Sequence, residues 1–149
     1  MRARQVADRC VSPRGTAHTQ QCSEADARTR LDHARRFLDV AELVAGEGED
    51  IEYASPAAAL AVLAGVAASD AACCKALGRR SRGQDHREAA ALLEQVAPNG
   101  KQAASSLRRL LQLKDEAHYG LFDIGGQDLK IALRNARRMV DFATETVQR

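Results

Sequence analysis

The residue types best suited to chemistry gather in one short segment, residues 114–120, with the sequence KDEAHYG. The segment places a cation, carboxylates, an imidazole and a phenol within two turns of a predicted helix. Residues three or four apart share a helix face, so Leu110, Lys114 and His118 form one stripe, and Tyr119 reaches around its rim. A core-facing stripe that turns polar indicates either a satisfied structural network or a site.

A single carboxylate, Asp70, interrupts the apolar stripe of a predicted helix over residues 57–77. A carboxylate in a core-facing position is costly unless a basic or hydroxyl group on a facing helix pairs with it. Two interpretations follow for Asp70. It is a structural residue, solvated or ion-paired, or it belongs to a binding site.

The turn at residues 78–83, with the sequence GRRSRG, is cationic. Arg80 and Arg82 could hold a phosphate near the start of the following helix, although a short charged run is also typical of solvated surface. Five residues separate Arg80 from His86. This spacing provides an alternative cation and histidine pair to Lys114 and His118.

Composition favours an all-α fold. The chain has 149 residues, about one domain, with 3% aromatic residues and no tryptophan, and a mixture rich in alanine and leucine favours helices over sheets. The net charge of +2 argues against strong non-specific DNA binding but permits a local basic face. The sequence has no glycine-rich phosphate loop, no Ser-His-Asp order and no cluster of metal ligands, so we expect no metal and no cofactor.

The cysteines Cys10, Cys22, Cys73 and Cys74 lack the spacing of a zinc site. Cys73 and Cys74 lie in an alanine-rich run, where free cysteine behaves as a small core hydrophobe. This usage fits a reducing cytoplasm. No segment approaches the ~20 apolar residues of a membrane span, and the start of the chain lacks a signal-type apolar core. We therefore predict a cytoplasmic protein without a membrane partner.

Residues 1–22 lack helical periodicity and are expected to form a flexible tail, and residues 23–149 are expected to form a single domain. Three- and four-residue spacing of apolar residues predicts five helices with short connections, hence an antiparallel four- to five-helix bundle. The predicted boundary signals are a capping box at Ser23, an N-cap at Ser55, a stop at Gly78, a cap at Asp85, a break at 98–100, a stop at Gly120 and a cap at Asp128.

The segment 110–147 resembles the C-terminal half of HEPN domains, small helical bundles found in prokaryotic nucleases, nucleotidyltransferase partners and defence proteins. The residues that carry the resemblance are Lys114-Asp115, His118-Tyr119, the glycine-containing connector, Asp128 and the last amphipathic helix. At pattern level the likeness extends over residues 24–147. Catalytic members of the family use an arginine and a histidine to cleave RNA without a metal. Here lysine stands in place of the arginine and the spacing is one residue short, so the motif is degenerate.

The resemblance implies two alternative functions. The first is a module that binds RNA, a nucleotide or a partner protein, such as a nucleotidyltransferase or an antitoxin, in a toxin-antitoxin or defence-type system. The second is a metal-independent endoribonuclease in which His118 acts as general base, Lys114 stabilises the developing charge, Asp115 orients the lysine and Tyr119 contacts a base or phosphate. The degenerate motif favours the binding module.

The resemblance also implies a homodimer, which we expect to form through the fourth or the last helix. We further expect Lys114, His118 and Asp70 to converge in one site, because all three have core-facing positions on helices that should be neighbours.

Overall fold

The computed structural model describes residues 18–46, 53–82, 86–119 and 124–149, and within 116–119 it describes only the helical backbone. This part of the chain is predominantly helical, as the composition predicted, with one small sheet in addition. The elements are β1 (Thr19–Gln21), α1 (Glu24–Gly46), α2 (Ala54–Leu77), β2 (Arg79–Ser81), α3 (His86–Leu93), α4 (Gly100–Tyr119) and α5 (Gly126–Gln148).

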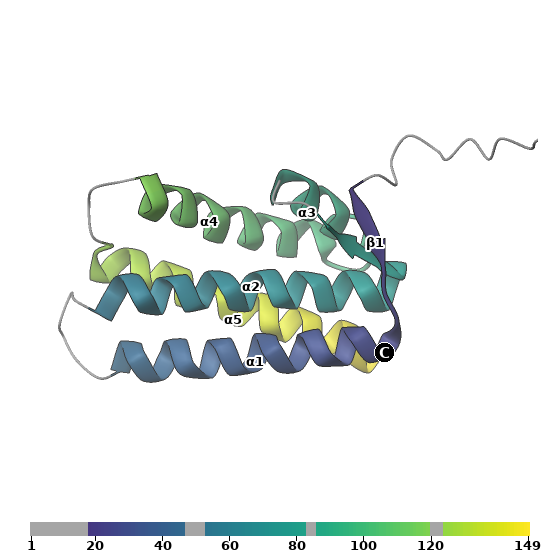
Figure 1. The fold of residues 1–149 in the computed structure, drawn as a ribbon, viewed down its shortest axis with the longest axis horizontal. Helices are drawn as coiled ribbons and strands as arrows, with labels where there is room; N and C mark the ends of the chain where they lie inside the picture. Colours follow the sequence, from purple (N-terminus) through teal and green to yellow (C-terminus); the bar gives the residue numbers. More distant parts are fainter. Residues whose placement is uncertain (1–17, 47–52, 83–85, 120–123) are drawn as a thin grey trace, which may run out of the picture.

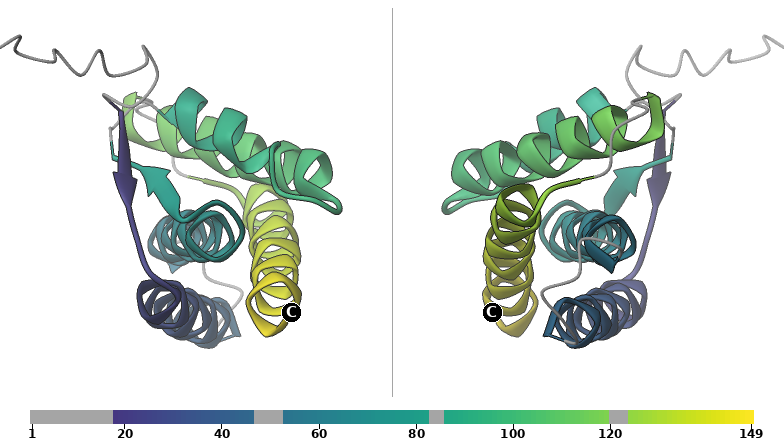
Figure 2. Two further views of the ribbon diagram at one scale, coloured as in Figure 1. Left: turned by 90° about the vertical axis from the view of Figure 1, so that its right-hand side faces the viewer. Right: turned by 90° about the vertical axis from the view of Figure 1, so that its left-hand side faces the viewer.

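The central element is α2, which contacts each of the other four helices. It runs antiparallel to α1, and α5 packs against both, while α4 lies across the α2 and α5 side of the molecule (Figures 1 and 2). Fifteen residues of α2 are buried, most of them alanines. Small side chains let neighbouring backbones approach closely: a Cβ at Gly65 would collide with Leu110 of α4.

Among the described residues, α2 is the one helix that is long and apolar enough to cross a membrane by length and composition. The expectation that no segment of the chain approaches the ~20 apolar residues of a membrane span was therefore wrong. Most of the helix is buried against the other helices, and a core helix that is apolar on all sides meets the same criterion. The criterion alone does not indicate a membrane span.

Helix boundaries follow the local signals closely at the start of α1. Ser23 and Asp26 form the predicted capping box: the Ser23 N–H donates to Asp26 Oδ2 at 2.8 Å, and the Asp26 N–H donates to Ser23 Oγ at 3.1 Å. Hydrogen bonds from the backbone and side chain of Ser23 lower the pKa of the Asp26 carboxyl. At the end of α2, Gly78 adopts the left-handed conformation that favours glycine, with φ of 68°.

Two other predicted caps were wrong. Tyr53 precedes α2 without a side-chain cap, and Ser55 lies inside the first turn, where its hydroxyl accepts a hydrogen bond from the Ile124 N–H at 3.3 Å. Gly125 is the N-cap of α5, and Asp128 lies within the first turn, where a carboxylate still complements the helix dipole. In both places the helix begins one or more residues before the polar side chain.

The N-terminal boundary of the fold also differs from the prediction. Residues 19–21 of the expected tail pair antiparallel with residues 79–81, with Gln20 opposite Arg80. Next to this sheet Cys22 forms a disulfide with Cys74. Cys74 is therefore not a free core cysteine, whereas Cys73 is free and buried as predicted. Residues 1–17 lie outside the described part.

Candidate functional site

A cavity of about 320 Å³ lies between the first half of α2 and the end of α4. Its wall is apolar except at Ser55, His86 and Lys114. The lining residues are Ser55, Ala58, Ala59, Val62, Leu63, Val66, His86, Leu113, Lys114 and Ile124. The hydrogen bond from Ile124 to Ser55 ties the start of α5 to the start of α2 beside this cavity.

Lys114 and His86 meet at the cavity, with Lys114 Nζ 2.9 Å from His86 Nε2. His86 opens α3, and Lys114 lies near the end of α4, so the packing of α3 against α4 creates the contact. Both side chains are partly buried. A lysine amine in its charged form has donors only, so in this contact Lys114 Nζ donates to the imidazole nitrogen.

The remaining residues of the predicted motif lie within five positions of Lys114 in the sequence. His118 and Tyr119 belong to the last turn of α4, but their side chains lie outside the described residues. Asp115 is exposed.

Asp70 is part of a separate cluster. Its Oδ2 accepts hydrogen bonds from Arg30 Nε at 3.0 Å and Nη2 at 2.8 Å, and from Arg80 Nη1 at 3.1 Å. The Asp70 side chain is only 11% exposed. Of the two interpretations of Asp70, the contacts match the structural ion pair: two cations from α1 and β2 compensate one nearly buried carboxylate.

The arginines of the basic turn at residues 78–83 make different contacts. Arg80 points to Asp70, while Arg82 is exposed, and its backbone N–H donates to the His18 carbonyl at 2.8 Å beside the sheet. The structure therefore joins Lys114 to His86 and Asp70 to Arg80, and these two pairs belong to different clusters. Lys114 and Asp70, which we expected to converge in one site, therefore lie in different clusters. The third residue of that expected site is His118, whose side chain lies outside the described residues.

Cys73 lies one helical turn from Asp70. Burial of the thiol, and then the negative charge of Asp70, raises the pKa of Cys73 to about 12. A thiol with so high a pKa has almost no thiolate at neutral pH, so Cys73 is not a nucleophile in the folded protein.

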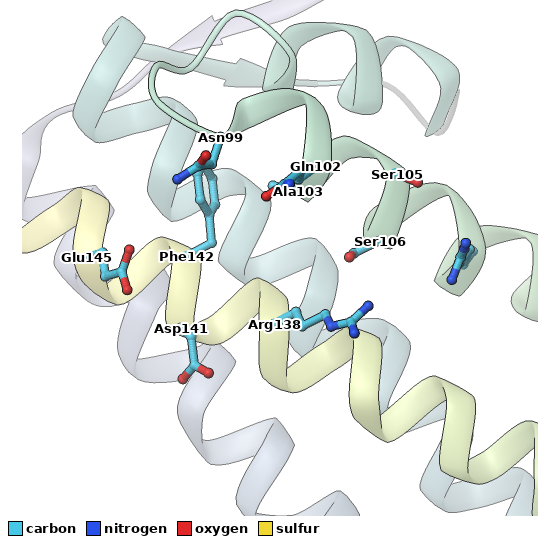
Figure 3. A pocket seen from close by; sticks show the side chains of 10 residues that line it. Asn99, Gln102, Ala103, Ser105, Ser106, Arg138, Asp141, Phe142 and Glu145 are labelled. Atoms are coloured by element: carbon cyan, nitrogen blue, oxygen red, sulfur yellow. The ribbon is translucent and has the colours of Figure 1, made fainter.

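Sequence reasoning missed a second, larger groove between α4 and α5, of about 570 Å³ (Figure 3). Its lining mixes polar and apolar surface and carries charges of both signs, with Arg109 and Arg138 as the cations and Asp141 and Glu145 as the anions. The residues that line it are Asn99, Gln102, Ala103, Ser105, Ser106, Arg109, Arg138, Asp141, Phe142 and Glu145. The spacing of the charges on the last helix was a signal that could have identified this face.

In the described ranges, no three histidine, cysteine or acidic side chains come together in a way that could hold a metal ion. In comparisons with protein-family models, with curated proteins and with solved structures, nothing matches the chain. The functional assignment therefore depends on the residues and contacts described above.

Proposed function

We propose that the protein is a HEPN-like helical module that binds RNA or a nucleotide at the cavity of Lys114 and His86. The observation that carries the proposal is the contact of a cation and an imidazole beside a mainly apolar cavity. A nucleotide needs both parts, because its base is a flat ring that favours apolar surface and its phosphate favours a cation. The volume of about 320 Å³ lies at the lower end of ordinary ligand pockets.

The proposed protein partner is based on the HEPN resemblance, and the proposed location is based on the composition. We propose a role in a bacterial toxin-antitoxin or defence-type system, with an antitoxin or a nucleotidyltransferase as the partner, in the cytoplasm. Cytoplasmic thiols are kept reduced by glutathione and thioredoxin, so at that location the Cys22–Cys74 disulfide would form only transiently.

Binding is tested by titrating a fluorescein-labelled single-stranded RNA with the protein and following fluorescence anisotropy, with adenosine monophosphate and inorganic phosphate as competitors. The proposal expects saturable binding that adenosine monophosphate displaces at lower concentration than phosphate does, because the base adds apolar contact. Absence of saturable binding at low salt would refute it.

The alternative function is metal-independent cleavage of RNA. It is favoured by the distance of 2.9 Å between Lys114 and His86, because a cation and an imidazole side by side can stabilise charge and transfer a proton. His118 is the histidine that the family resemblance assigns to this role. Incubation of single-stranded RNA in chelator distinguishes the alternatives: cleavage that is lost in His118→Ala or His86→Ala supports the enzyme, and intact RNA with saturable binding supports the module.

A further inference from the structure

The groove of about 570 Å³ between α4 and α5 carries its positive and negative charges at opposite ends. Along α5, Arg138 comes first, and Asp141 and Glu145 follow three and seven residues later. Because α4 runs antiparallel to α5, the last residue of α4 in the lining, Arg109, belongs to the same end as Arg138 (Figure 1). The groove is therefore positive at one end and negative at the other.

The four charged side chains of the lining are exposed, and within the described part of the chain none of them takes part in an ion pair. The spacing of three residues between Arg138 and Asp141 would permit such a pair on a helix. Arg137, the residue before Arg138, provides the contrast, because it pairs with Glu42 of α1. The charges of the groove are thus available to a ligand.

Four exposed cations flank the groove without lining it. Lys130 and Arg134 precede Arg138 on α5 and extend the positive end. Lys101 and Arg149 lie towards the negative end, because the start of α4 is beside the end of α5. Water and salt screen these flanking charges, so a positively charged ligand group must be held at that end by direct contact with the two carboxylates.

The middle of the groove offers both apolar and hydrogen-bonding surface. Figure 3 shows Phe142 directed from α5 towards α4, with Gln102 and Ser106 on the α4 side. Phe142 is half-buried and adds apolar contact. The amide and hydroxyl side chains can donate hydrogen bonds to peptide groups and accept hydrogen bonds from them. This middle part suits a peptide backbone between two charged ends.

The distance between the two ends matches the length of a tripeptide. Arg138 and Glu145 lie seven residues apart, which corresponds to about 10 Å along a helix axis. An extended peptide rises about 3.3 Å per residue, so the terminal ammonium and carboxylate of a tripeptide are also about 10 Å apart. The volume of about 570 Å³ lies within the range of ordinary ligand pockets.

We propose that the groove between α4 and α5 binds a short peptide of about three residues through its free termini. Arg109 and Arg138 hold the carboxylate, because the planar guanidinium group binds a carboxylate through two hydrogen bonds. Asp141 and Glu145 hold the terminal ammonium. The proposal does not depend on the ligand of the other cavity, which lies between α2 and α4.

The first test is isothermal titration calorimetry of the protein with trialanine at low salt and about pH 7, where both termini of the peptide are charged. We expect saturable binding of one peptide per chain. N-acetyl-trialanine and trialanine amide each lack one terminal charge and should each bind about tenfold more weakly. The proposal is overturned if trialanine shows no saturable binding up to about 10 mM, or if all three peptides bind equally well.

The second test combines variants of the protein with variants of the peptide. Arg138→Gln should weaken binding of trialanine about tenfold and should remove most of its advantage over trialanine amide, because the carboxylate has lost a contact. Glu145→Gln should likewise remove most of the advantage of trialanine over N-acetyl-trialanine. Each variant should retain the preference at the other terminus. If either variant instead changes the preference at the opposite terminus, the proposed orientation is wrong.

Arg134→Gln is the matched control for Arg138→Gln, because it removes the same charge one turn away and outside the lining. It should change the affinity for trialanine less than about threefold, since the charge acts only through screened solvent. An equal loss in both variants would show general attraction in place of a site and would overturn the proposal. Circular dichroism checks that each variant is folded. Should Arg138→Gln fail to fold, Arg109→Gln on the facing helix provides the same test.

Discussion

Lys114 Nζ lies 2.9 Å from Nε2 of His86, although 28 residues separate them in the sequence. The contact joins the end of α4 to the start of α3 beside an apolar cavity. Two residues that the sequence analysis assigned to alternative cation and histidine pairs thus meet in one place. This relationship is the basis of the proposed function and of the first prediction.

Replacing Lys114 with methionine should weaken binding of single-stranded RNA or a nucleotide about tenfold or more, because the side chain keeps its length but no longer offers a charge to phosphate. Fluorescence anisotropy measures the affinity. The free energy of unfolding should fall by only about 1 kcal/mol, because a single part-buried hydrogen bond is lost. Lys101→Met, at an exposed position of the same helix, is the matched control, and an equal loss of affinity there would contradict the role of Lys114.

Replacing Asp70 with asparagine should lower the free energy of unfolding by about 1–3 kcal/mol, because Arg30 and Arg80 then lose their shared carboxylate. Both arginines are partly exposed, so water compensates part of the loss. Urea unfolding provides the measurement. Asp39→Asn, at an exposed position of α1, should change stability little. If Asp70→Asn and Asp39→Asn lower the free energy of unfolding by the same amount, the ion-pair cluster of Asp70 contributes little to stability.

The pKa of the Cys73 thiol is raised from 9.0 to about 12 by burial and by the charge of Asp70. Above about pH 9 the unfolded chain loses this proton while the folded protein retains it. The stabilisation is therefore complete below pH 9 and is lost as the pH rises towards about 12. In this window the free energy of unfolding should fall by up to about 1.4 kcal/mol per pH unit.

The Cys73→Ala variant removes this contribution while all other titrating groups remain. Urea unfolding at several values between about pH 8 and about pH 10.5 should thus give a shallower decline for the variant than for the wild type. Parallel declines would show that Cys73 titrates alike in the folded and unfolded chains.

Loss of the Cys22–Cys74 disulfide should destabilise the protein by about 2–4 kcal/mol, because the bond closes a loop with a sequence separation of 52. The measurement is unfolding of the wild type with and without reductant. The double variant C22A/C74A is the control, since reductant should not affect it. A wild type that reductant leaves unchanged would indicate that the bond contributes nothing to stability.

The local features of this protein were predictable from the sequence. Helix α1 and the capping box of Ser23 and Asp26 depend on residues three or four apart, and so does the buried face of α5. The need of Asp70 for a basic partner was also predictable, because a carboxylate at a core-facing position must be compensated. These properties are determined within one or two helical turns.

The identity of the partners was decided only by the tertiary structure. Nothing local indicates that Cys22 bonds to Cys74, that Gln20 pairs with Arg80, or that His86 contacts Lys114. In each case the chain returns after a long separation, and the packing of small residues on α2 sets where the other elements lie. Helix periodicity fixes which face of an element is buried, but the distance between two distant side chains depends on how all the faces fit together.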